Sequence, residues 1–231
     1  MNVLTVMGTA HKGNTRAVVD LFLKEFEDDN NSFDELVLPN DFNNFCMGCA
    51  NCILKGEDKC PHYNEVSKIV ERIEKADLII LATPVFVGSC SGSMKAFLDH
   101  LAYMWLVHRP NESMFNKVGL IVTSAGGSGV KQTVKLLKSN LFYLGVPTIY
   151  NYGITTMKMG GNYSDYKDKD KIKNQVSKKA KQIKKSLSKR KVGFKTKFFF
   201  KLFGMTQKNG WNKTDADYWK EKGWLDGKKP Y

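Results

Sequence analysis

Residues 3–15 read Val3-Leu4-Thr5-Val6-Met7-Gly8-Thr9-Ala10-His11-Lys12-Gly13-Asn14-Thr15, a short apolar run followed by a loop of small residues. From Asn14 to Phe26 the apolar residues then recur at helical spacing. An apolar strand that leads through a glycine-containing loop into an amphipathic helix is typical of parallel α/β sheets. We therefore expect this stretch to form the first strand, loop and helix of such a fold.

The chain repeats this alternation of strand and helix as far as residue 155. The expected strands are 33–38, 78–82, 118–122 and 147–152, and the expected helices lie around 66–73, 93–105 and 130–144, the last closed by Gly145. The run Leu78–Ala82 is short and continuously apolar, as expected of a strand buried on both faces. Crossovers between five such strands predict an α/β fold, a three-layer α/β/α sandwich with a five-stranded parallel sheet.

The charge of the chain is concentrated in its last third. Residues 1–159 hold 15 Lys/Arg and 16 Asp/Glu, whereas residues 160–231 hold 21 and 7, a net charge of +14. We therefore expect one domain at 1–158 and a basic, aromatic-rich helical C-terminal extension at 159–231, with a lysine-rich helix from about 166 to 191.

Five phenylalanines lie in residues 194–203, and no acidic residue occurs between Lys171 and Lys213. The favoured interpretation is that the aromatic side chains pack on the first domain or on a second subunit, so that the extension is an ordered cap. Contact with an anionic membrane surface is the second interpretation. Nucleic acid is supported by charge alone and is not expected as a partner.

The loop at residues 8–15 has the features of an anion site. Its small residues let backbone N–H groups approach a ligand, Thr9 and Thr15 carry hydroxyls, and a helix N-terminus follows. Asn14 stands where a nucleoside-triphosphate loop requires lysine, and the dinucleotide pattern G-x-G-x-x-G is absent. The loop therefore favours a monophosphate.

Two further loops follow expected strands at the same edge of the sheet. Residues 83–89 combine a proline, a phenylalanine and a glycine, and residues 124–129 hold three glycines. Glycine allows close backbone approach to a ligand, and the apolar side chains can lie against a planar heterocycle.

The chain resembles the NAD(P)H-dependent FMN reductases of flavodoxin-like fold over about residues 1–155. The resemblance rests on G-T-x-H-K-G-N-T at 8–15, A-T-P-V-F-V-G at 82–88, S-M-K-A-F-L-D-H at 93–100 and S-A-G-G at 124–127. It implies that the first loop holds the phosphate of FMN and that the other two hold its ring. The residues implied are Thr9, His11, Lys12, Gly13, Asn14 and Thr15 for the phosphate, and Pro84, Val85, Phe86, Val87, Gly88, Ser124, Ala125, Gly126 and Gly127 for the ring.

Four cysteines, Cys46, Cys49, Cys52 and Cys60, lie within fifteen residues, and Pro61 follows the last. Their spacing is close to that of bacterial ferredoxins, apart from a longer gap before Cys60. Among the FMN reductases this motif is similar to that of the iron–sulfur flavoproteins, which implies a [4Fe–4S] cluster; a zinc site and free thiols remain the alternatives. Cys90 lies apart from them and is expected to be a small buried residue.

The resemblance implies an enzyme that takes hydride from NAD(P)H onto bound FMN and passes electrons to a small acceptor or through an iron–sulfur cluster. The alternative is a non-enzymatic electron carrier or redox sensor. No catalytic residue is assigned, and His100 and His108 are expected at the surface. A homodimer or homotetramer is implied by the resemblance. The N-terminal sequence does not have the pattern of a signal peptide and no apolar run is long enough to span a membrane, so we expect a cytoplasmic protein.

Overall fold

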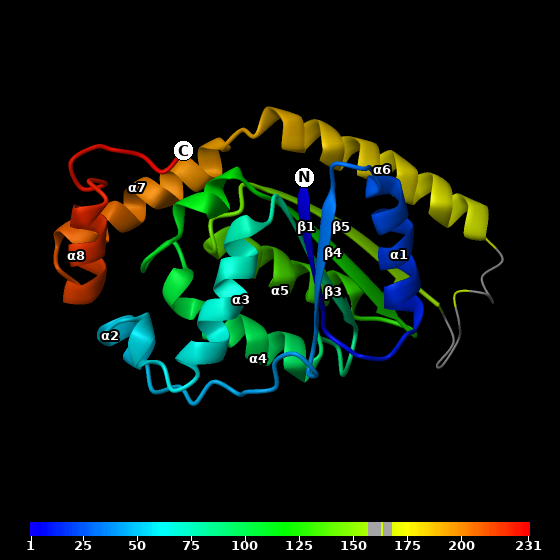
Figure 1. Cartoon of the computed structure of the whole chain (residues 1–231), viewed down its shortest axis with the longest axis horizontal. Helices are drawn as coiled ribbons and strands as arrows, with labels where there is room; N and C mark the ends of the chain where they lie inside the picture. Colours follow the sequence, from blue (N-terminus) through cyan, green and yellow to red (C-terminus); the bar gives the residue numbers. More distant parts are fainter. Residues whose placement is uncertain (157–162, 164–167) are drawn as a thin grey trace.

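The computed structural model describes residues 1–156, 163 and 168–231 (Figure 1). Its centre is a sheet of five parallel strands in the order β2-β1-β3-β4-β5. The strands are β1 (Asn2–Met7), β2 (Ser32–Val37), β3 (Leu78–Pro84), β4 (Val118–Ala125) and β5 (Thr148–Thr155). This is the order of a flavodoxin-like fold, which reverses direction next to β1.

Helices cover both faces of the sheet, as the continuous apolar runs of β3 and β4 require. One face packs against α3 (Tyr63–Lys75), α4 (Gly92–His100) and α5 (Val130–Tyr143), through residues such as Leu4, Ile79 and Leu137. The other face packs against α1 (Asn14–Phe26) and α6 (Lys169–Lys189), through residues such as Val3, Phe22 and Ile183. The predicted three-layer sandwich is confirmed.

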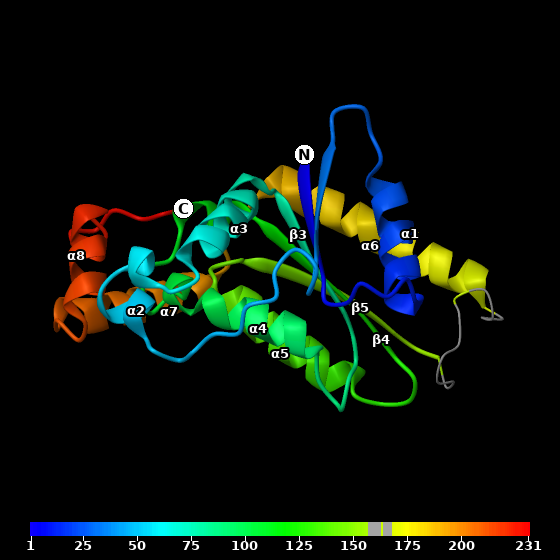
Figure 2. The same ribbon diagram turned by 60° about the horizontal axis from the view of Figure 1, so that its bottom comes forward.

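The C-terminal helices add a third, smaller core at one end of the sandwich. Helices α7 (Phe194–Lys208) and α8 (Lys213–Glu221) and the segment after α8 pack onto Leu106 and Phe115 through Phe200, Trp219 and Trp224. Both helices lie toward the left of Figure 1, where α8 is next to the short helix α2 (Asn51–Leu54), and Figure 2 shows α8 beside α2 from a second direction.

The observed helices and strands differ from the predicted ones mainly in where they begin and end. Strands β3, β4 and β5 each run two or three residues further than expected. The helix expected at 93–105 ends at His100 and continues as a 3-10 turn, Ala102–Met104. Gly145 ends α5 with a φ of +100°, as predicted, and Cys90 is buried.

The start of the lysine-rich helix expected near residue 166 lies outside the described residues, and so does the division expected after residue 158. The helix that follows, α6, shares the core formed by α1 and the sheet. Among the described helices, none has the length and apolar character needed to cross a bilayer.

Candidate functional site

The three loops at the carboxyl edge of the sheet contact one another. A Cβ at Gly8 would lie 2.7 Å from the Ser91 hydroxyl, and a Cβ at Gly129 would lie 2.6 Å from a methyl of Val85. Thr15 and Ser124 share a hydrogen bond of 2.6 Å between their hydroxyl oxygens. Each loop therefore touches another, and together they form one cradle, which we call the loop cradle: residues 8–15, 83–91 and 124–129.

The first loop presents uncapped donors at the start of α1. Gly13 is the N-cap, so no side chain accepts a hydrogen bond from the first N–H groups, and the first turn holds no acidic residue. The positive end of the helix dipole is thus available to an anion. Thr9 is already used locally, because its hydroxyl accepts a hydrogen bond of 3.1 Å from the His11 N–H.

Lys12 is the cation that remains available to this loop. The neighbouring Arg16 is held by Asp20 and Glu35, whereas Lys12 enters no ion pair among the residues that the structure describes. A hollow of about 380 Å³ adjoins the loop and is lined by His11, Lys12 and Arg16 among others. This donor set fits a phosphate monoester.

The second loop turns tightly and exposes apolar side chains. Phe86 and Ser89 exchange two backbone hydrogen bonds, and the residues between them, Val87 and Gly88, have φ values of +49° and +76°. Both positive values describe a type I′ turn, a strained conformation for a β-branched valine. The turn leaves Phe86 and Val87 exposed, while Pro84 and Val85 are half-buried.

The third loop supplies backbone next to this turn. Ser124 and Ala125 are buried at the end of β4, and the Ser124 carbonyl accepts a hydrogen bond of 2.8 Å from the Val85 N–H. Gly126 and Gly127 are exposed. Exposed apolar side chains beside open glycine backbone fit a planar ring, so the residues of the loop cradle fit FMN.

A separate candidate site is the cysteine segment, residues 46–60, between β2 and α3. None of its four cysteines is in a disulfide; Cys46 and Cys49 are exposed, and Cys52 and Cys60 are half-buried. Burial raises the pKa of the Cys52 thiol, and the nearby charges of Cys60, Cys46 and Cys49 raise it further. Cys52 therefore lies within electrostatic range of the other three thiols, and thiolates are the donors that an iron–sulfur cluster requires. Within the described ranges, however, no three His, Cys, Asp or Glu side chains are arranged as a site for a single metal ion.

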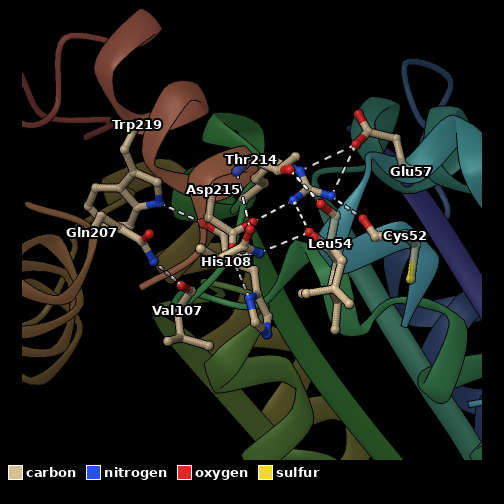
Figure 3. A network of polar contacts seen from close by, with 12 residues as sticks. Cys52, Leu54, Glu57, Val107, His108, Gln207, Thr214, Asp215 and Trp219 are labelled. Carbon is tan, nitrogen blue, oxygen red and sulfur yellow. Dashed lines mark hydrogen bonds and ion pairs between the residues drawn. The ribbon is translucent and has the colours of Figure 1, made fainter. Parts of the chain in front are cut away.

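A buried polar network fastens the cysteine segment to the C-terminal extension (Figure 3). At its centre is Asp215, which is completely buried. One carboxylate oxygen accepts a hydrogen bond from Arg109. The other accepts hydrogen bonds from His108 at 2.8 Å and from Asn212 at 2.9 Å. The charge of Asp215 is thus fully paired.

The same network supplies hydrogen-bond donors to the carbonyl groups of α2. Arg109 donates to the carbonyl oxygens of Cys52 and Ile53. Two more bonds come from the start of α8: its N-cap Asn212 donates to the Ile53 carbonyl at 2.9 Å, and Thr214 donates to the Leu54 carbonyl at 2.7 Å. A helix of four residues cannot pair these groups internally, so α8 and Arg109 do so.

The prediction that His100 and His108 lie at the surface is wrong. His100 is buried, and burial lowers its pKa; one ring nitrogen lies 2.7 Å from the Ala96 carbonyl and the other 2.9 Å from His62. His108 is half-buried between Asp215 and the ring of Trp211. Both histidines bind neighbouring groups that lie far away in sequence, which no local pattern could indicate.

Sequence reasoning also missed Arg109 and Asp215. The run Asn212-Lys213-Thr214-Asp215 does carry the pattern of a helix N-terminus, a capping asparagine with an acidic residue in the first turn. That pattern could have located the start of α8. It could not have shown that the aspartate is buried against an arginine 106 residues earlier.

Comparison with known proteins extends these observations. An iron–sulfur flavoprotein of Archaeoglobus fulgidus is 28% identical over 135 residues, which cover 58% of this chain and 59% of that protein. An iron–sulfur flavoprotein of Methanocaldococcus jannaschii is 28% identical over 163 residues, 70% of this chain and 81% of that protein. The chain thus spans less than two thirds of the first relative's length.

A solved structure of similar fold is the FMN-dependent NADH-azoreductase of Bacillus anthracis in complex with FMN. Its TM-score is 0.59 at 11% identity, and the match covers 79% of this chain and 98% of that chain. The family model of the NADPH-dependent FMN reductases matches residues 1–157, which hold all three loops of the cradle. The chain belongs to the NADPH-dependent FMN reductase family.

Proposed function

We propose that this protein is an FMN-dependent NAD(P)H oxidoreductase whose loop cradle holds the flavin. The observation that supports this most is the mutual contact of three loops at one edge of the sheet. FMN, when bound, accepts hydride from a nicotinamide nucleotide and passes electrons onward. The protein itself would bind and orient the cofactor and its substrates.

Each loop of the cradle has a distinct task in this proposal. The N–H groups of the first turn of α1, which no side chain caps, would hold the phosphate together with Lys12 and the Thr15 hydroxyl. The turn at Phe86–Ser89 and the backbone of Ser124–Gly127 would hold the ring and restrict access of water to one side. We assign no general acid or base, because hydride transfer does not require a proton at a side chain.

The experiment that tests this proposal is anaerobic mixing of the FMN-loaded protein with NADH or NADPH. Rapid loss of flavin absorbance with one of them supports an oxidoreductase. Absence of reduction by both would contradict it and favour a carrier or sensor that receives electrons from a protein partner. Subsequent mixing with a quinone or with free flavin identifies the class of small acceptor.

For the cysteine segment we propose a [4Fe–4S] cluster held by Cys46, Cys49, Cys52 and Cys60. Their number, their spacing and the names of the relatives support this. A cluster, when bound, would supply single-electron transfer. Anaerobic purification with iron and sulfide assays tests it: about four of each per chain supports the cluster, whereas zinc or metal-free thiols would contradict it.

The same preparation tests the homodimer or homotetramer implied by the resemblance. Sedimentation of the FMN-loaded protein at several concentrations distinguishes these assemblies from a monomer.

A further inference from the structure

Helix α7 has one buried face that fixes it to the body of the protein. Thr196, Phe200 and Gln207 are buried, and they lie on one side of the helix. The Phe200 ring stacks on Trp219 at 4.6 Å between centroids, and Gln207 donates to the Val107 carbonyl. The expectation that the aromatic residues of 194–203 pack on the body is met in part. Phe200 is buried and Phe199 and Phe203 pack partly against the same core, whereas Phe194 and Phe198 are exposed.

The opposite side of α7 carries a second row of large apolar side chains, which we call the α7 stripe. They are Phe194, Phe198, Leu202 and Met205, at positions i, i+4, i+8 and i+11. At about 100° per residue they fall within an arc of about 80° and extend over about 17 Å of the helix. They are 83%, 52%, 38% and 51% exposed. A row of this kind is an exposed apolar patch, not a scatter of single residues.

Lysines flank the α7 stripe. By the same helical geometry Lys197, Lys201 and Lys208 lie along one side of it, and Lys195 lies along the other. Lys195 and Lys197 also lie over the rings of Phe142 and Tyr231. Lys201 and Lys208 have no ion-pair partner in the described part of the chain. From 171 to 213 the sequence holds 15 basic residues and no acidic one, so the surroundings are positive as well.

A hollow of about 710 Å³ adjoins the lysine side of the stripe. Lys197, Lys201 and Lys208 line it from α7, and Lys228 and Lys229 line it from the C-terminal segment. Asp226 is the one acidic residue among its described lining residues. Five lysines around an open hollow fit the phosphate groups of an anionic partner.

The charge and the exposed apolar side chains of α7 together indicate which kind of partner binds this face. A second copy of this chain would bring a second extension of net charge +14 against the first, which opposes association through this face. A nucleic acid would use the lysines but not four large apolar side chains. A bilayer with anionic headgroups uses both, because the apolar row enters the headgroup boundary while the lysines contact phosphates.

We propose that α7 binds the surface of an anionic phospholipid membrane through the α7 stripe and its flanking lysines. The helix lies in the plane of the interface, and its buried face keeps the FMN-binding body attached at that surface. This inference does not depend on the activity proposed above, because binding is measured without turnover.

The test is cosedimentation of the full-length, FMN-loaded protein with vesicles. We expect binding to vesicles in which about a third of the lipid is phosphatidylglycerol, and little binding to phosphatidylcholine alone. Raising the salt to about 0.5 M should release most of the protein, because the lysine–phosphate attraction is screened.

Two double variants measure the contributions of the lysines and of the apolar side chains to vesicle binding separately. Lys201→Gln/Lys208→Gln should lower the partition coefficient about 25-fold, at about fivefold per lysine. Phe194→Ala/Phe198→Ala should lower it by about tenfold or more through lost apolar burial. The matched controls are Phe33→Ala, a 45% exposed phenylalanine on β2, and Lys24→Gln/Lys68→Gln on α1 and α3; all should bind vesicles like the wild type.

Bound flavin and circular dichroism establish that each variant is folded. Loss of vesicle binding in both α7 variants, with the controls unaffected, supports the proposal. It is overturned by equal binding to both vesicle types, by retained binding in either α7 variant, or by no vesicle binding at all. If no vesicle binding is seen, a concentration-dependent dimer, or binding to nucleic acid, would identify the occupant of this face instead, provided that the same α7 variants abolish it.

Discussion

The loop cradle and the cysteine segment are built in different ways. In the cradle, each loop follows a strand, and the sheet brings the strand ends together, so that Gly8, Ser91 and Gly129 meet neighbouring loops. The cysteine segment holds two short helical turns and no strand. The carbonyl groups of α2 are paired by Arg109, Asn212 and Thr214, which lie 50 to 160 residues away. The first site is positioned by the fold itself, and the second by a polar network that reaches it from the C-terminal extension.

This comparison predicts that the two sites can be disrupted separately. The largest effect is expected for Asp215→Ala, which removes the buried counter-charge of the Arg109 guanidinium and leaves it only the half-exposed Glu57. The free energy of unfolding, measured with urea, should fall by about 3–5 kcal/mol. Alkylation of the cysteine thiols should become faster, while FMN affinity of the folded fraction stays within about twofold. The control is Asp217→Ala, on the exposed side of the same helix. A large loss of FMN affinity in the Asp215 variant would show that the loop cradle and the cysteine segment are not independent.

The converse change is Thr15→Val in the cradle. It removes the hydroxyl that contacts Ser124 and that we assign to the phosphate. We expect the dissociation constant for FMN, measured by quenching of flavin fluorescence, to rise about tenfold to a hundredfold. The cysteine alkylation rate should not change. Thr15→Ser keeps the hydroxyl and should restore most of the affinity; equal weakening in both variants would exclude the hydroxyl as a ligand.

A variant with a smaller expected effect tests whether α8 holds the cysteine segment in place. Thr214→Val removes the donor to the Leu54 carbonyl, at a cost in unfolding free energy of about 1 kcal/mol. If α8 holds the cysteine segment in place, Cys52 should also be alkylated faster than in the wild type. Mass spectrometry of the labelled peptide measures this for each cysteine. Faster unfolding without a change in Cys52 labelling would show that the contact only supports α8.

The smallest effect concerns pH and the contact between His62, next to the cysteine segment, and His100 on α4. The pKa of His100 is lowered by burial, so the unfolded chain binds a proton at this residue more readily than the folded one. Stability should therefore be complete above the ordinary histidine pKa of about 6.5 and fall as the pH drops below it. In His100→Gln the difference in unfolding free energy between neutral and mildly acidic buffer should be smaller. An unchanged difference would assign the pH dependence to other groups.

Local patterns predicted most of the sandwich. Helix α1 begins and ends at the predicted residues, and each strand contains most of its predicted range, because apolar periodicity and glycine-containing turns act over a few residues. The division of α7 into a buried and an exposed face was not predictable in this way. Five phenylalanines in ten residues do not show which of them will meet Trp219.

The sequence by itself determined the order of strands and helices, the three loops at the strand ends and the position of the four cysteines along the chain. Only the tertiary structure decided that Val87 sits in a strained turn, that Asp215 pairs with Arg109, and that His100 is buried. The physical reason is the distance along the sequence over which each kind of interaction acts. Strand and helix propensities are set by neighbouring residues, whereas burial and ion pairing depend on which distant segments the folded chain brings into contact.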